Sequence, residues 1–132
     1  MRTIHFVLLL LLPIASGAGP FEYVCTIKQE LSVASDGSLK PYKNPIEVGN
    51  TFAIDRKTGK IIGKPFNNST AGEVKVLNGG STKHSFEVLS VSSPTGKVTT
   101  DLIAVHEYMK GQEKTFIGVE SGTGTVYSGT CK

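Results

Sequence analysis

The chain has 132 residues, 39% of them hydrophobic, with 14 Lys and Arg against 11 Asp and Glu. This length provides one compact domain but not two. A net charge of +3 is too small to indicate a nucleic-acid or membrane-surface partner, and the lysines fall beside turn glycines rather than on one basic face.

The first 18 residues have the layout of a signal peptide. One cation, Arg2, precedes an apolar run of about ten residues, and small residues follow at positions 15–18. Pro13 breaks the apolar run, which is shorter than the roughly 20 residues of a spanning helix. We expect cleavage after Ala18, which leaves residues 19–132 as a single domain of net charge +2 with no membrane span.

Residues 21–33 alternate between apolar and polar side chains, with Val24 and Gln29 as the exceptions. Because alternate side chains of a strand point to opposite faces, this pattern predicts a half-buried strand whose odd-numbered residues face inward. The strand should end at the turn of Ser35, Asp36 and Gly37.

The next segments predict one loop, one hairpin and a second loop. Residues 39–50 contain Pro41 and Pro45 and are expected to be irregular, since proline cannot donate to a central ladder. Two short apolar runs flank the turn at residues 57–59, which is typical of a β-hairpin. Residues 65–72 form the second loop.

From residue 73 onward, short apolar runs are separated by turns that contain glycine or proline, and no stretch has a helical period. The runs lie at residues 73–77, 84–91, 98–108, 115–119 and 125–128. The whole pattern predicts an all-β domain, a small antiparallel meander of about seven or eight strands. We expect a closed or nearly closed β-barrel, with a small β-sandwich as the alternative, because each strand must cover one apolar face.

Two cysteines remain after cleavage, and export brings them to an oxidising compartment. Cys25 lies on the apolar side of the first strand, and Cys131 follows the last strand. An even count of two leaves one intramolecular pairing, so the sequence predicts a Cys25–Cys131 disulfide. This bond requires the first and last strands to be neighbours, as in a closing barrel.

Two histidines, His84 and His106, follow the signal peptide. We expect His84 on the surface and His106 on the inward face of residues 98–108, as a buried, hydrogen-bonded side chain. Glu107 points to the opposite face and cannot share a substrate proton with His106. His106 and Tyr108 are nevertheless the candidate ligand-binding residues. No metal site is expected, because zinc needs three or four converging ligands, and no cofactor motif is present.

Asn67 and Asn68 begin two overlapping N-glycosylation sequons. These sequons have a meaning only in a eukaryotic secretory pathway. Elsewhere the segment is a polar loop, which is the interpretation that we favour.

Three segments, residues 21–25, 52–63 and 129–132, resemble small exported bacterial proteins that share an aromatic-rich start, an Asp-Arg-x-Thr-Gly hairpin and a terminal cysteine. The resemblance implies a periplasmic or secreted location in a Gram-negative bacterium. It implies no activity.

The absence of any catalytic motif favours a binding protein over an enzyme. Small barrels of about eight strands fill their interior with side chains or hold one small ligand. We therefore expect a non-enzymatic periplasmic or extracellular protein that binds a protein or small ligand through its loops or one barrel mouth, a class that includes secreted enzyme inhibitors. The alternatives are a small secreted hydrolase, whose residues such as Asp101, His106 or Tyr108 converge only in three dimensions, and a structural or surface-assembly subunit.

Overall fold

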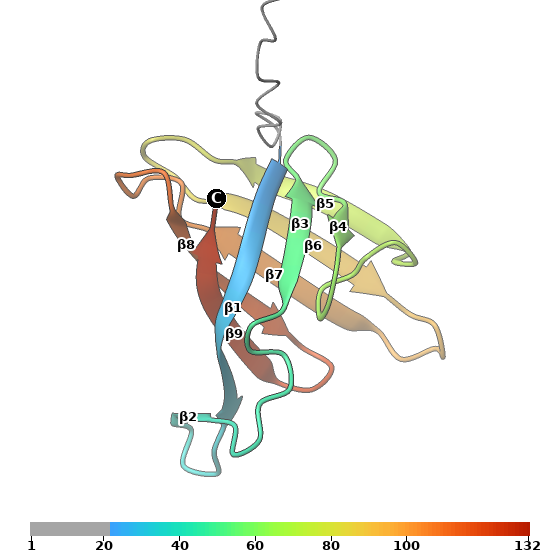
Figure 1. The fold of residues 1–132 in the computed structure, drawn as a ribbon. Coiled ribbons are helices and arrows are strands. Elements are labelled where there is room, and N and C mark those ends of the chain that lie inside the picture. The colour runs from blue at the N-terminus through green and yellow to red at the C-terminus, as the bar shows by residue number, and fades with distance from the viewer. Residues whose placement is uncertain (1–21) are drawn as a thin grey trace, which may run out of the picture.

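The computed structural model describes residues 22–132, and this part of the chain forms nine β-strands and no helix (Figure 1). The all-β class predicted from the sequence is confirmed. The predicted signal peptide at residues 1–18 lies outside the described residues. The strands are β1 (Glu22–Val33), β2 (Leu39–Pro41), β3 (Thr51–Asp55), β4 (Ile61–Ile62), β5 (Glu73–Gly79), β6 (Phe86–Ser92), β7 (Thr99–Val105), β8 (Lys114–Glu120) and β9 (Thr125–Cys131).

The strands form one antiparallel sheet in the order β4-β3-β1-β9-β8-β7-β6-β5, and β2 adds to β1. The sheet curls through 268°, so the predicted nearly closed barrel is confirmed and the sandwich is not formed. As predicted, the first and last long strands are neighbours, and β1 and β9 lie side by side in Figure 1. A seam remains between the edge strands β4 and β5.

The disulfide joins Cys25 on β1 to Cys131 on β9, and both residues are fully buried. These residues are direct partners in the β1–β9 ladder. The flanking pair, Val24 and Lys132, exchanges both backbone hydrogen bonds, which makes the cysteine pair a non-hydrogen-bonded one. Opposite residues approach most closely at such sites, and the two Cα atoms are 3.9 Å apart.

The interior of the barrel is filled by aromatic and branched side chains. The rings of Phe52, Phe66 and Phe116 meet edge to face, with centroids 5.2–5.3 Å apart, and Phe66 continues the cluster to Tyr127. Gly118 on β8 makes room for this packing, because a Cβ there would lie 2.4 Å from Cζ of Phe66. Among residues 22–132, the space of ligand size lies at one end of the barrel and on its outside.

The loop between β4 and β5 closes the seam with side-chain hydrogen bonds instead of a strand ladder. Asn68 is buried and accepts a hydrogen bond from the backbone N–H of Ile61 (2.7 Å). Its amide nitrogen donates to the carbonyl oxygen of Gly59 and to Oγ of Ser90, each at 2.9 Å. One side chain therefore ties the β3–β4 hairpin to β6.

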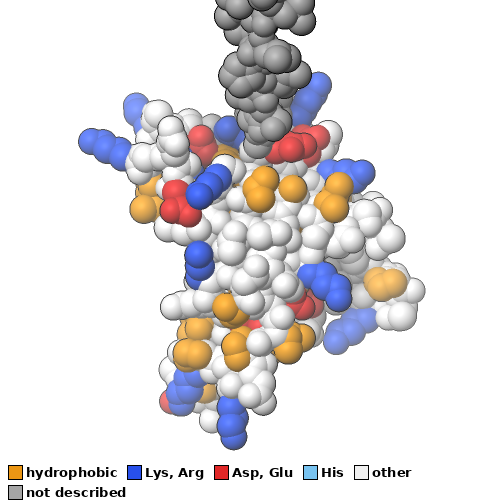
Figure 2. Space-filling view, in the orientation of Figure 1, with side chains coloured by type: hydrophobic (Ala, Val, Ile, Leu, Met, Phe, Trp, Pro, Cys, Tyr) orange, Lys and Arg blue, Asp and Glu red, His pale blue; other side chains and the backbone are white. Residues whose placement is uncertain are grey.

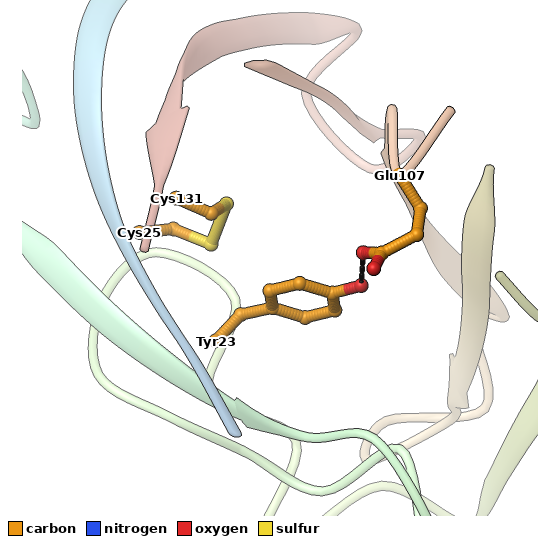
Figure 3. Close-up of a disulfide and its surroundings, with 4 residues drawn as sticks. All are labelled: Tyr23, Cys25, Glu107 and Cys131. Atoms are coloured by element: carbon orange, nitrogen blue, oxygen red, sulfur yellow. Dashed lines mark hydrogen bonds between the residues drawn. A yellow bond between two sulfur atoms is a disulfide. The ribbon is translucent and has the colours of Figure 1, made fainter. Parts of the chain in front are cut away.

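One end of the barrel is closed by a polar plug. Tyr23 on β1 extends its ring across the interior and donates a hydrogen bond to Glu107 in the β7–β8 loop (Figure 3). The Arg56 guanidinium lies over the Tyr23 ring, 4.9 Å from its centroid, and 3.8 Å from a Glu107 carboxylate oxygen. Burial and the hydrogen bond to Glu107 raise the pKa of Tyr23, so the phenol stays neutral. We call this the closed end.

Several expectations about single segments need correction. Residues 39–41 are not irregular, because they pair with the end of β1 as the short edge strand β2, where Pro41 is tolerated. The strand predicted at residues 98–108 ends at Val105. Its inward face is the odd-numbered one: Ile103 is fully buried, whereas Leu102 is 39% exposed. His106 is therefore not on an inward face.

Candidate functional site

The end opposite the plug is hollowed by a cavity of about 460 Å³. We call this the open end. Its lining includes three carboxylates, Glu30, Glu47 and Glu120, and one lysine, Lys64. Tyr42, Tyr127, Ile46 and Pro65 provide aromatic and apolar surface, and Thr123 and Thr125 provide hydroxyl groups.

Glu30 reaches the interior because of a β-bulge. The β1–β9 register shifts between Ile27 and Gln29, so the inward face of β1 changes from odd to even residues. The carboxylate of Glu30 is thereby buried, with 7% of the residue exposed. Strand periodicity alone does not reveal Glu30, because it extends the odd parity to the end of the strand; the break in alternation at Gln29 is the signal that the sequence offers.

Glu30 also positions the loop after β2. Its Oε2 accepts hydrogen bonds from the backbone N–H groups of Ile46 and Glu47, both at 3.0 Å. The side chain of Glu47 is held in turn by Asn50, whose amide donates to Oε2 at 2.5 Å. The loop that forms one wall of the cavity is therefore fixed to β1 through a carboxylate.

Glu30 belongs to a row of polar residues on the inner face of four neighbouring strands. Glu30 is the direct ladder partner of Tyr127, Thr125 is the partner of Glu120, and Glu120 is the partner of Asp101. Directly opposite side chains have Cβ atoms about 4.5–5.5 Å apart. We call these five residues the polar belt.

The belt concentrates negative charge near the floor of the cavity. Burial, followed by the charges of Glu120, Glu30 and Glu47, raises the pKa of the Tyr127 phenol. Burial and the charge of Glu120 raise the pKa of Asp101 to about 6. The cavity lining holds three Glu against one Lys, a net charge of −2, whereas the mature chain as a whole is expected to carry +2.

An apolar rim borders the open end. Ile46 is 79% exposed, and Val33, Leu39 and Val48 are each more than 40% exposed. Hydrophobic side chains gather at the bottom of Figure 2, over the β1–β2 hairpin. A ligand at the open end would therefore meet carboxylates at the floor and apolar groups at one edge.

The candidate ligand-binding residues His106 and Tyr108 lie at the closed end, in the β7–β8 loop. Their rings are tilted by 41° at a centroid distance of 5.6 Å, and Nδ1 of His106 is 2.8 Å from Oγ1 of Thr115. His106 borders a groove of about 420 Å³ on the outside of the barrel. Asp101 is at the other end of β7, about 16 Å away at the usual rise of a strand, so the grouping of Asp101, His106 and Tyr108 is not formed.

The two sequon asparagines have different environments. Asn67 is exposed, and its Oδ1 accepts a hydrogen bond from the N–H of Ser69. Asn68 uses both its amide oxygen and nitrogen inside the seam. Of the two positions, only Asn67 offers a side chain that could carry a glycan without opening the barrel.

Among residues 22–132, no group of three or more His, Cys, Asp or Glu side chains is arranged to hold a metal ion. The same residues form no helix long and apolar enough to cross a membrane. Comparison with family models, curated proteins and solved structures gave no match to this chain.

Proposed function

We propose that the mature chain is an exported, non-enzymatic binding protein that holds a small ligand at the open end. The observation that carries this proposal is the cavity of about 460 Å³, a size within the usual range of about 300–1,000 Å³ for small-molecule sites. The filled core and the plug of Tyr23 and Glu107 leave the open end as the one barrel mouth with such a space among the described residues. The disulfide supports an oxidising location, which we propose is the periplasm or the extracellular space.

The proposal can be tested by heteronuclear NMR of the oxidised mature protein with mixtures of small cationic, neutral and anionic compounds. We expect chemical-shift changes at the backbone amides of Glu47, Glu120 and Thr125. Amides of the β7–β8 loop at the closed end are the internal control. No shift at the open end with any mixture, or shifts confined to the groove beside His106, would contradict the proposal.

A hydrolase is the second candidate, and the pairing of Asp101 with Glu120 favours it. Two carboxylates that face each other can act as acid and base, and burial and the charge of Glu120 raise the pKa of Asp101, its ladder partner, to about 6. A panel of glycan and ester substrates tests this candidate. Turnover that is lost in Asp101→Asn but retained in Asp55→Asn would replace the binding proposal, because Asp55 caps its own turn at the closed end.

A further inference from the structure

We infer that the ligand of the open end is a small organic cation, an ammonium group attached to an apolar body. This inference rests on the proposed function, because it names the chemical class that the same cavity selects. It follows from one accessible carboxylate oxygen, the balance of charge around the cavity, and the aromatic surface beside it.

The first step concerns the second oxygen of Glu30. Oε2 is occupied by two backbone N–H groups, whereas no described residue donates a hydrogen bond to Oε1. Among the described residues, no fully buried side-chain oxygen or nitrogen lacks a partner, so Oε1 is not fully buried. Glu30 lines the cavity and exposes only 7% of its surface. A largely buried carboxylate with one oxygen free of protein donors attracts a positively charged group, because opposite charges attract more strongly away from bulk water.

The second step concerns charge. Glu47 and Glu120 add two further carboxylates to the lining, and Lys64 compensates only one charge. Burial, and after it the charges of Glu120, Glu30 and Glu47, raise the pKa of the Tyr127 phenol. The carboxylates would repel an anionic ligand, whereas they attract a cation.

The third step separates an organic cation from a metal ion. Calcium takes six to eight oxygen ligands at about 2.3–2.6 Å, but the carboxylates of the open end are not grouped closely enough to hold a metal ion. Oε2 of Glu30 and Oε2 of Glu47 are also occupied by N–H donors. The carboxylates are spread around a wider space, which suits a larger cation.

The fourth step concerns the body of the ligand. Tyr42 and Tyr127 line the cavity, and aromatic faces attract alkylammonium groups as well as apolar carbon. Ile46 and Pro65 extend the apolar surface toward the rim. Carboxylates combined with tyrosines and aliphatic groups are the surroundings that an alkylammonium ion prefers over bulk water.

The test compares three probes of one shape: choline, its neutral isostere 3,3-dimethyl-1-butanol, and the anion 3,3-dimethylbutanoate. NMR titration of the oxidised mature protein at low salt and near-neutral pH should show that choline shifts open-end amides. We expect the neutral isostere to bind at least about tenfold more weakly, the difference that about 1.4 kcal/mol produces. The anion should not bind. Added salt should weaken choline binding, because screening reduces the attraction of exposed charges.

Glu120→Gln is the informative variant, since Glu120 accepts only a long hydrogen bond of 3.4 Å from Tyr127 and its loss leaves the Glu30 contacts intact. It should weaken choline binding about fivefold, as expected for a partly exposed charge pair of about 1 kcal/mol. Glu113→Gln makes the same charge change in the exposed loop of the closed end and should leave binding unchanged.

The outcomes distinguish this inference from the proposed function. If the neutral isostere or the anion binds the open end as tightly as choline, or if Glu120→Gln binds choline normally, the inference is overturned and the binding site stands. If choline has no effect while another compound of the mixtures shifts open-end amides, the inference is again overturned and the proposed binding site stands. If no compound shifts these amides, both are overturned.

Discussion

Replacing Asn68 by Ala tests whether this side chain closes the barrel. The variant loses the hydrogen bonds with Ile61, Gly59 and Ser90 and leaves the buried N–H of Ile61 without a partner. Three hydrogen bonds contribute about 0.5–1.5 kcal/mol each, and an unpaired buried donor costs about 1–3 kcal/mol. We expect the free energy of unfolding to fall by about 2–4 kcal/mol, below the full sum, because water can enter the opened seam. The midpoint of thermal unfolding should fall by roughly 10–20 °C.

The neighbouring asparagine provides a matched control. Asn67→Ala removes the same atoms, but Asn67 is exposed and accepts one hydrogen bond, from Ser69 at 3.1 Å. Its effect should stay within about 0.5 kcal/mol. Urea unfolding followed by far-UV circular dichroism measures both variants, and hydrogen exchange should show faster exchange of β4 amides in Asn68→Ala alone. Equal losses in the two variants, or full stability of Asn68→Ala, would refute the closure of the seam by Asn68.

Three other predictions follow from the core and the open end. Reduction of the Cys25–Cys131 bond, which closes a loop of sequence separation 106, should lower the unfolding free energy by up to about 4.8 kcal/mol; an unchanged urea midpoint would contradict this. Gly118→Ala places a Cβ against Phe66 and should cost about 1–3 kcal/mol in the same assay, whereas wild-type stability would show that the ring moves freely. Because the folded pKa of Asp101 is about 6 and its ordinary value is 3.8, its contribution to stability should fall as pH rises from about 4 to about 6. Asp101→Asn should remove that decline in stability. An equal decline in the variant would show that Asp101 does not cause it.

Much of the fold can be predicted from the sequence because local rules and strand periodicity determine it. The turns at Gly37, Gly59, Gly96 and Gly124 adopt positive φ angles, which glycine tolerates without strain. The hairpin around residues 57–59 is formed as predicted, with Ile54 opposite Ile61. These signals required no knowledge of distant contacts.

The residues of β7 and β1 that point into the barrel could not be predicted, for two different physical reasons. In β7, Leu102 and Ile103 belong to a continuous apolar run, so period two does not show which of them is inside. In β1, the bulge exchanges the faces midway, and Glu30 becomes the buried residue while Val33 is 57% exposed. A bulge depends on the partner strand, which the sequence of β1 alone does not contain.

The candidate site could not be predicted either, because it is formed by residues that are far apart in the sequence. Its carboxylates come from β1, from the loop after β2 and from β8, at positions 30, 47 and 120. No spacing rule connects such positions. The sequence indicates His106 and Tyr108 as candidate ligand-binding residues, but the barrel places His106 and the cavity at opposite ends.

The inner face of the barrel changes from apolar at the closed end to acidic at the open end. Along β7 and β8, the inward residues near the closed end are Val105 and Phe116, and those near the open end are Asp101 and Glu120. The raised pKa of Asp101 shows that its charge is held at a cost to the folded state. Two carboxylates on opposite ladder positions inside a barrel do not add to stability, and one of them, Glu120, lines the cavity for which we propose a binding role. The protein should therefore remain folded after Asp101→Asn in the polar belt. It should not remain folded when the Phe116 side chain near the closed end is removed.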